Sequence, residues 1–466
     1  MRCIVLPFTL LKLTRYLGVS SGRRSFSSAT GSRPLKESYQ FIPLMARHCL
    51  SQLNQDWSRR QPLQGKTVLL NMHLTTITLM VIEILRQSQA RLEVIVAPEL
   101  AQQVSARQAV LQAGIPLLEQ IPEHKRHGYY DIIYDCGAGM RKLTPRLGMV
   151  ELTQTQPDWY ADLDFPVITV DQSLTKSVET GLGTGDSVVR LIYQLAREAL
   201  TLTANCSKEN IVNNPFYWQL LFSLLQVNQL FSAHRFIIFG YGKVGSGIAQ
   251  ALENAGTPKQ NIFIVEVELA AYLQTIRSGY PGLWLNEDFH LSQSIQRIKS
   301  LLPQSWAVIT ATGQAGALSR YFKQEDFVRV PLLLNMGTYD EFGQGFAPER
   351  ILNNKKPANF MLEYPTEVRY LDPIFSLFLQ GGEELLDNSK LAPGLNKISL
   401  KRDHSVLSNW LRQHGDILWQ HSVEQKQTEK FIQNLRQHSI FSSALYESHS
   451  TPISATPVYP AASCSH

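Results

Sequence analysis

Several classes of protein are excluded by what the sequence lacks. Its 466 residues include only five cysteines, which form no C-x-x-C pair and stand at no ligand spacing from a histidine. This argues against a disulfide framework and against a metal site, and it favours a reducing compartment. No apolar run approaches the roughly 20 residues that span a bilayer. The formal charge of +5 comes without a basic stripe interleaved with aromatics, so neither a membrane nor a nucleic acid is an expected partner.

The first 35 residues also lack Asp and Glu, yet they contain six basic residues and the serine-rich stretch 25-SFSSATGS-32. This composition suits a mitochondrial transit peptide, and it equally suits an unstructured basic extension of a cytoplasmic protein. We expect a cytoplasmic protein, with mitochondria as the alternative. Residues 441–466, rich in Ser, Thr and Pro, are expected to form a flexible tail.

The rest of the chain is long enough for two or three globular domains and alternates strand-like and helical segments. Such alternation predicts parallel sheets with helices on their faces, and ligands then bind beyond the carboxyl ends of the strands. In the first half those ends single out His73, Thr75, Asp135, Cys136 and the stretch 167–176. Strands are predicted over 66–72, 92–97, 131–135 and the start of 167–176, and helices over 39–55 and 75–87.

A helical segment over residues 186–203 and again 215–231 then separates the two halves and resembles a hinge. The second half is predicted to contain strands over 236–239, 262–268, 282–286, 306–313 and 332–337, and a helical end over 406–437 follows. Thr312, Gly313 and Asn335 stand at two of these strand ends, where they could contact a nicotinamide riboside.

The strongest local signal is 236-FIIFGYGKVGSG-247, a strand that runs into G-x-G-x-x-G and opens a helix. In a dinucleotide-binding turn Gly240 permits the tight bend, Gly242 lets a pyrophosphate approach the backbone, and Gly245 lets the helix lie against the strand. Glu266 ends the next strand and is placed to accept hydrogen bonds from a ribose diol. Its charge favours NAD over NADP. A glycine-rich turn without a ligand is the alternative interpretation.

Further stretches resemble the S-adenosylhomocysteine hydrolase family, whose cofactor stretch has the form GYGxVGxGxAQAL. This chain has 240-GYGKVGSGIAQAL-252, and it has 43-PLMA-46, 61-QPLQGKTV-68, 72-MHLTTITLMVIEIL-85, 167-VITVDQSLTKS-177, 307-AVITATG-313 and 335-NMGTYD-340 in the family's order. The resemblance implies two doubly wound α/β domains, the second a Rossmann NAD-binding domain inserted in a substrate domain. The implied boundaries are 36–190 and 351–440 for the substrate domain and 191–350 for the Rossmann domain.

The resemblance also implies an activity, the reversible hydrolysis of S-adenosylhomocysteine to adenosine and homocysteine through 3′-oxidation by tightly held NAD. It implies a place in one-carbon metabolism, a nucleoside-type substrate and a homo-oligomer. Such chemistry needs a base with a depressed pKa and carboxylates that grip a diol. By position, the implied catalytic residues are His73, Asp135, Glu151 and Lys176, with Thr75 at the substrate. The implied cofactor residues, beyond the glycines and Glu266, are Thr153, Thr155, Lys243, Val244, Thr312, Gly313 and Asn335.

The chain departs from the family at the substrate chemistry. A second catalytic aspartate is replaced by Cys136, and a ribose-binding glutamate is replaced by Leu152. Further replacements are Thr180, Gly181, Gly185 and Thr338. Cys136 is expected to be a small buried residue, with a substitute nucleophile as the alternative. Three hypotheses remain open: a divergent hydrolase, an NAD-dependent enzyme acting on another alcohol or nucleoside, and a non-catalytic NAD-binding regulator.

Overall fold

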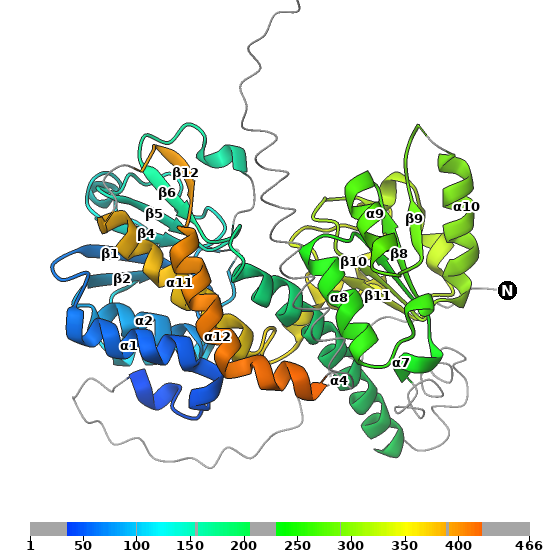
Figure 1. The fold of residues 1–466 in the computed structure, drawn as a ribbon, viewed down its shortest axis with the longest axis horizontal. Helices are drawn as coiled ribbons and strands as arrows, with labels where there is room; N and C mark the ends of the chain where they lie inside the picture. Colours follow the sequence, from blue (N-terminus) through cyan, green and yellow to red (C-terminus); the bar gives the residue numbers. More distant parts are fainter. Residues whose placement is uncertain are drawn as a thin grey trace, which may run out of the picture. The chain divides into compact units, whose positions relative to one another are not determined.

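The computed structural model describes residues 35–98, 100–153, 157–205, 230–288, 290–387 and 391–421. Within these ranges the strands form two parallel sheets packed with helices, so the predicted α/β class with two parallel-sheet domains is confirmed (Figure 1). The basic extension through residue 34, most of the predicted segment 215–231, the residues beyond 421 and the expected tail all lie outside the described residues.

The first sheet has the strand order β12-β6-β5-β4-β1-β2-β3. The order along the chain reverses between β1 and β4, so the carboxyl ends of these two strands flank the switch point where ligands bind in such folds. The short strands β3, β5 and β12 had not been predicted from the sequence. The strands are β1 (Thr67–Asn71), β2 (Arg91–Ile95), β3 (Leu117–Leu118), β4 (Ile132–Asp135), β5 (Gly148–Glu151), β6 (Pro166–Thr169) and β12 (Gly394–Lys397).

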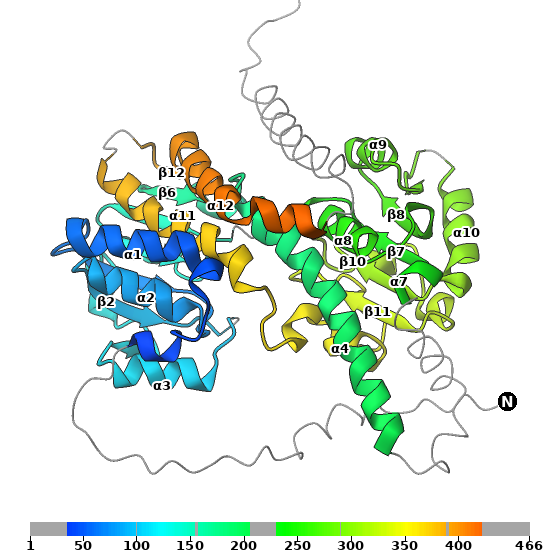
Figure 2. The same ribbon diagram turned by 60° about the horizontal axis from the view of Figure 1, so that its bottom comes forward.

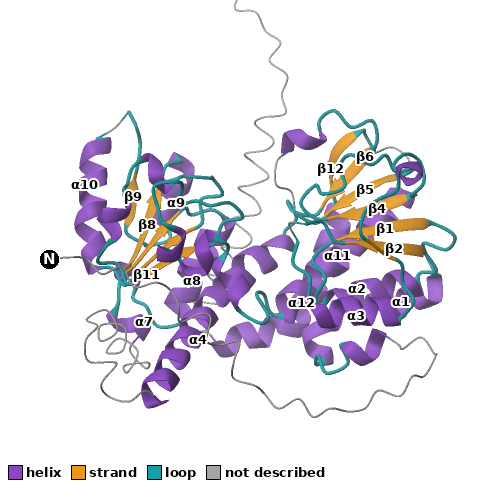
Figure 3. Ribbon diagram, turned by 180° about the vertical axis from the view of Figure 1, so that it is seen from behind, coloured by secondary structure: helices purple, strands orange, loops and turns teal. Residues whose placement is uncertain are grey.

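Helices cover one face of this sheet, and loops cover the other. Alternate strand residues such as Val68 and Ile132 pack against the helices, while Leu69 and Ile133 pack under loops and the short turn η5 (Pro157–Tyr160). Figure 3 shows helices along one side of the orange strands. The helices of that face are α1 (His48–Arg60), α2 (Thr78–Gln87), α3 (Val104–Gln112) and α11 (Val368–Asp387).

The first predicted helix, over residues 39–55, begins later than the pattern indicates. Two 3₁₀ turns, η2 (Leu35–Ser38) and η3 (Leu44–Arg47), precede α1. Pro43 lies just before η3 with an extended ψ of 140°, and this conformation interrupts a continuous helix. The apolar residues of this segment therefore reach the first core from two short turns and a helix, and they do not form one face of a single helix.

The second sheet has the order β11-β10-β7-β8-β9, which is the order of one Rossmann-type dinucleotide-binding unit. All five strands lie where the sequence predicts them. They are β7 (Phe236–Phe239), β8 (Ile262–Glu266), β9 (Gly282–Trp284), β10 (Ala307–Thr310) and β11 (Leu332–Asn335). The helices around them are α4 (Thr184–Asn205), α7 (Leu230–Ala233), α8 (Lys243–Asn254), α9 (Leu269–Arg277) and α10 (Leu291–Leu301).

The described part of the predicted hinge, α4, is a packed helix of the second domain. Its residues Val188, Leu191 and Ile192 are fully buried in the same core as Ile248 of α8, and α4 runs alongside α8 (Figure 2). A Cβ at Gly185 would overlap the backbone carbonyl of Gly247 in α8. Glycine at 185, one of the departures from the hydrolase pattern, therefore permits a close helix–helix approach.

The chain returns to the first sheet after the second domain is complete. Strand β12 pairs with β6 from Gly394 opposite Pro166 to Lys397 opposite Thr169, and α11 lies in the first core. The second domain is therefore inserted into the first. Helix α12 (Leu400–His421) follows β12.

Asp372 of α11 caps α1 from within the first core. Its carboxylate is fully buried and accepts the backbone N–H groups of Cys49 at 2.8 Å and Leu50 at 2.9 Å. Burial raises the pKa of Asp372 to about 6, against the opposing effect of these two hydrogen bonds.

We expect this carboxyl group to make the stability of the protein depend on pH. Because its pKa is higher in the folded state, its contribution is fully present below about pH 4 and is lost as the pH rises through 6. The free energy of unfolding of the wild type, relative to that of Asp372→Asn, should fall by up to about 3 kcal/mol over this window. Denaturant titrations of both proteins at several pH values measure the difference, and a constant difference would contradict it.

Candidate functional site

The glycine turn after β7 has the geometry that its sequence predicts. Gly240 has a φ of +96°, and a Cβ there would overlap the carbonyl of Ala311. A Cβ at Gly245 would overlap the carbonyl oxygen of Gly240, so α8 lies against the end of β7 only because residue 245 is glycine. At Gly242, by contrast, a Cβ would meet no atom within 4 Å. The turn is thus closed on its inner side and open at Gly242, where α8 begins.

The start of α8 contributes the remaining residues of this turn. The first N–H groups of a helix have no partner within the helix and carry its positive dipole end, which favours phosphate oxygens. Val244 packs against the second core, which anchors this helix start. Lys243 is exposed, and its ammonium donates to the backbone carbonyl of Asp171 at 2.8 Å. This contact engages the Lys243 ammonium with the protein backbone, so it does not test the predicted role of Lys243 at the cofactor.

Glu266 ends β8 beside the glycine turn, as predicted. The carboxylate is buried and accepts the backbone N–H groups of Tyr241, of Val267 at 3.0 Å and of Glu268 at 3.4 Å. A carboxylate has about four acceptor positions, so these three bonds leave limited capacity for a ribose hydroxyl. The bond from Tyr241 also ties the glycine turn to β8, a role that the sequence did not indicate.

The residues predicted at the ends of β10 and β11 are held by protein groups. Glu341, which sequence reasoning missed, is fully buried and accepts the N–H groups of Thr312 at 2.8 Å and Gly313 at 2.6 Å. Burial raises the pKa of Glu341. The Asn335 amide accepts from Thr310 at 3.0 Å and donates to the carbonyls of Tyr339 at 2.8 Å and Lys355 at 2.5 Å. These side chains shape the loops around the turn.

In the first domain, the two acidic residues implied by the hydrolase resemblance hold one loop. Asp135, at the end of β4, accepts from Asn71 at 2.7 Å and from the N–H groups of Cys136 and Met140 at 2.9 and 2.8 Å. Glu151, at the end of β5, accepts four hydrogen bonds. Their donors are the N–H groups of Gly137, Ala138 and Thr153 and the hydroxyl of Tyr160.

Both carboxyl groups are inaccessible, with exposed fractions of 1% for Asp135 and 0% for Glu151. Burial raises the pKa of each, and the charge of Asp135 further raises the pKa of Glu151. Cys136 is also buried, as expected, and burial together with the charge of Glu151 raises the pKa of its thiol. A raised pKa opposes the thiolate that a nucleophile needs.

Lys176, another of the predicted catalytic residues, is also buried and held by protein groups. Its side chain is 2% exposed, and its ammonium lies 2.6 Å from a Glu179 carboxylate oxygen. It also donates to the carbonyl of Leu152 at 3.2 Å and to the hydroxyl of Thr153 at 3.0 Å. One ion pair and two hydrogen bonds thus hold the ammonium group.

The electrostatics of Lys176 are opposite to those of a depressed-pKa base. Burial lowers its pKa, but the charges of Glu179 and then Asp171 outweigh burial, so the net shift is upward. A lysine that holds its proton this firmly is a cation at neutral pH rather than a proton acceptor.

A buried aspartate that the sequence did not reveal positions the loop before Lys176. Asp403 of α12 accepts the N–H groups of Leu174 at 2.7 Å and Thr175 at 3.0 Å, and the Thr175 hydroxyl at 2.6 Å. It lies more than two hundred positions away in the chain, and no local pattern marks it.

His73 and Thr75 follow β1, as predicted. The His73 ring accepts the N–H of Ala101 through Nδ1 at 2.9 Å and lies 5.8 Å from the Phe360 ring. Burial, followed by the charge of Lys176, lowers the pKa of His73, so the ring is neutral at pH 7 and carries its proton on Nε2. The backbone N–H of Thr75 donates to the Thr78 hydroxyl at 2.8 Å, within the first turn leading to α2. Thr155 lies outside the described residues.

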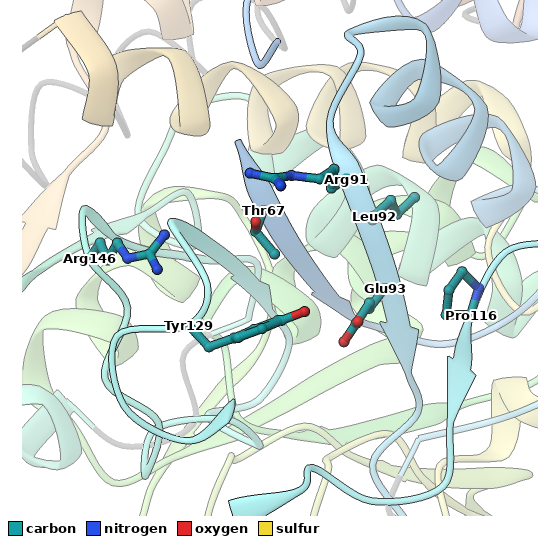
Figure 4. A pocket seen from close by; sticks show the side chains of 7 residues that line it. All are labelled: Thr67, Arg91, Leu92, Glu93, Pro116, Tyr129 and Arg146. Carbon is teal, nitrogen blue, oxygen red and sulfur yellow. The ribbon is translucent and has the colours of Figure 1, made fainter. Parts of the chain in front are cut away.

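A pocket in the first domain lies at the amino ends of the strands, opposite the carboxyl ends where the predicted site residues stand (Figure 4). None of the predicted site residues line it. Its acidic member Glu93 is already bonded to Lys125 at 2.6 Å and to the Tyr130 hydroxyl at 2.7 Å. The lining residues are Thr67, Arg91, Leu92, Glu93, Pro116, Tyr129 and Arg146.

Among the described residues, no three His, Cys, Asp or Glu side chains come together as a metal-binding group. None of the helices in the described ranges is long and apolar enough to cross a membrane.

The fold and the glycine turn define the second domain as a Rossmann-type unit of the dinucleotide-binding class. No protein-family model matches the sequence, and no curated protein matches it. Among solved structures, a dipicolinate synthase chain from Bacillus halodurans is similar at 11% identity and a TM-score of 0.38, over 68% of this chain and 98% of that one.

Two other solved structures are similar at lower TM-scores. A dipicolinate synthase chain from Bacillus subtilis has 9% identity and a TM-score of 0.31, over 77% of this chain and 98% of that one. Transhydrogenase from Sinorhizobium meliloti has 10% identity and a TM-score of 0.31, over 69% of this chain and 92% of that one. Because these TM-scores are low, the assignment of the fold rests on the strand order of this chain itself.

Proposed function

We propose that the protein binds NAD through its second domain and that it is a relative of adenosylhomocysteinase without that enzyme's proton chemistry. The lack of proton chemistry is supported by the ammonium group of Lys176, which is buried, paired with the Glu179 carboxylate and hydrogen-bonded to Leu152 and Thr153. The third of the three hypotheses, a non-catalytic NAD-binding regulator, agrees best with it.

The glycine turn supports the cofactor assignment. The space beside Gly242 admits a pyrophosphate, the N-terminus of α8 favours its charge, and Glu266 stands at the end of the neighbouring strand for the ribose. When bound, NAD would supply a hydride acceptor. Chemistry on a sugar would further require groups that accept and return protons.

The first domain provides no such group among the residues implied by the resemblance. Asp135 and Glu151 are buried acceptors for backbone N–H groups, and Lys176 is a firmly protonated cation. Neutral His73 has Nδ1 occupied by Ala101, and its other nitrogen carries the proton. Leu152 stands where the family has a diol-binding carboxylate. Loss of charge-assisted hydrogen bonds worth roughly 1.5–3 kcal/mol each removes useful substrate affinity.

The proposal that the second domain binds NAD predicts a preference for NAD over NADP. The Glu266 carboxylate repels the 2′-phosphate of NADP, so NAD should bind at least about tenfold more tightly, a difference of about 1.4 kcal/mol. Isothermal titration of both dinucleotides measures this ratio. Glu266→Gln should narrow it, and equal affinities in the wild type would contradict the role of Glu266.

The proposal that the protein lacks the hydrolase's proton chemistry predicts that protein saturated with NAD releases no thiol from S-adenosylhomocysteine. A thiol-reactive dye follows homocysteine release, and an authentic hydrolase in the same assay provides the positive control. Release above background that disappears in Lys176→Ala would refute the proposal and restore the hydrolase hypothesis. If the protein did not bind NAD at all, the proposed NAD site would be refuted, whatever the result of the thiol assay.

A further inference from the structure

Two arginines meet at the pocket that Figure 4 shows, a cavity of about 370 Å³ at the amino ends of the first sheet. Arg91 begins β2 and lies opposite Thr67, the first residue of β1. Arg146 comes just before β5 and bonds to Asp131, which precedes β4. In Figure 4 the two guanidinium groups are directed toward each other from opposite sides of Thr67. Side chains from separate strands therefore converge on one cavity.

The groups that converge there have hydrogen-bond donors to spare. Arg91 donates to the carbonyl of Gly65 at 2.9 Å, and Arg146 donates to Asp131 at 3.3 Å. Within the part of the chain that the structure describes, neither guanidinium makes a further bond, although each carries five N–H donors. Thr67 is only 8% exposed, and its hydroxyl has no bonded partner among the described residues. A ligand in the pocket would find three donor groups available.

The acidic groups around the pocket are already paired. Glu93 is bonded to Lys125 at 2.6 Å, and Asp131 accepts a backbone N–H at 2.8 Å as well as the bond from Arg146. Arg91 has no acidic partner among the described residues. Three cations, counting Lys125, thus stand against two carboxylates. A cavity lined by an excess of one charge attracts the opposite charge, so an anion is the expected occupant.

We propose that this pocket binds a small phosphate monoester, with the phosphate held by Arg91, Arg146 and the hydroxyl of Thr67. A carboxylate presents two oxygens, whereas a phosphate monoester presents three strong acceptor oxygens, one for each of the three donor groups. The planar fork of a guanidinium group is well suited to bidentate contacts with phosphate.

The size and walls of the pocket indicate the rest of the ligand. A cavity of about 370 Å³ falls within the range of sites for small organic molecules and exceeds what a phosphate ion alone would fill. The ring of Tyr129 also lines the cavity and offers an aromatic surface (Figure 4). The group esterified to the phosphate is therefore apolar or aromatic.

Isothermal titration of phenyl phosphate into the full-length protein tests the proposal. Excess NAD in both solutions occupies the proposed dinucleotide site, so the two binding events are measured separately and either can fail alone. The dissociation constant of phenyl phosphate should be about 1 mM or lower. Benzoate should bind at least about tenfold more weakly, and phenol, which lacks the phosphate, should not bind. Equal binding of phenyl phosphate and phenol would overturn the proposal, as would equal binding of phenyl phosphate and benzoate.

Variants of the two arginines locate the binding. Arg91→Gln and Arg146→Gln should each weaken phenyl phosphate binding at least about tenfold, because each removes a charged donor group. Both side chains are exposed, so the variants should fold, and thermal melts check this. Arg86→Gln is the matched control, because Arg86 is an exposed residue of α2 that pairs with Glu83 and does not line the pocket.

The outcomes separate this site from general attraction by surface charge. Loss of affinity in Arg91→Gln and Arg146→Gln, with wild-type affinity in Arg86→Gln, would support the site. No heat of binding from phenyl phosphate at up to about 10 mM would overturn it. Affinities of Arg91→Gln and Arg146→Gln equal to that of the wild type, or an equal loss in Arg86→Gln, would overturn it as well.

Discussion

Replacing Gly242 with alanine is expected to leave the protein folded and to weaken NAD binding by at least about tenfold. The backbone at Gly242 has a φ of −70°, which alanine adopts without strain, and no atom lies within 4 Å of the added methyl group. The methyl group would instead occupy the space through which a pyrophosphate reaches the backbone. Calorimetric titration of NAD, together with a thermal melt, separates the two effects.

Gly245→Ala is the matched comparison and should have the opposite profile. There the methyl group would overlap the carbonyl oxygen of Gly240, a backbone atom that cannot move aside without separating α8 from β7. Overpacking of this kind costs about 3 kcal/mol, so folding itself should suffer. If Gly242→Ala bound NAD like the wild type, the phosphate would not approach at this turn.

Lys176→Met should destabilise the protein by about 3 kcal/mol and leave its affinity for NAD unchanged. Methionine keeps the length of the side chain, but it leaves the Glu179 carboxylate without its cation and the Leu152 carbonyl without its donor. Breaking a buried pair by removing one partner is costly because the remaining charge is uncompensated.

The double variant Lys176→Met/Glu179→Gln should recover at least half of this loss, since no unpaired charge remains. Denaturant titration measures the free energy of unfolding of both variants. A catalytic Lys176 would give another pattern: the single variant would be nearly as stable as the wild type and would lose turnover. These outcomes distinguish a structural cation from a general base.

The sequence predicted the fold where local signals are strong. Long apolar strands such as 236–239 and 332–335, and the glycines that bend or tighten a turn, carry their structure in consecutive residues. The two-residue strand β3 and the edge strand β12 could not be predicted, because they form only through pairing with β2 and β6. Tertiary context decides such short strands.

The candidate site was predictable in position and less so in chemistry. His73 and Lys176 follow β1 and β6, and Asp135 ends β4, near the strand ends that the sequence indicated, whereas Glu151 ends β5, which the sequence did not predict. The partners that decide their chemistry come from elsewhere. Ala101 fixes the His73 ring, and Asp403 holds the loop before Lys176. For Lys176 the charges of Glu179 and Asp171 outweigh burial and raise its pKa, which is opposite to the depressed pKa expected of a base.

The insertion of one domain into the other bears on how the chain folds. Strand β12 is synthesised only after the whole second domain, yet it must pair with β6 to complete the first sheet. Pairing between such distant segments is slow, because a long loop must close before the contact forms. The second domain, whose five strands are consecutive along the chain, can therefore fold during synthesis while the edge of β6 is still exposed. Until residues 394–397 arrive, that edge is open to pairing with a strand of another chain.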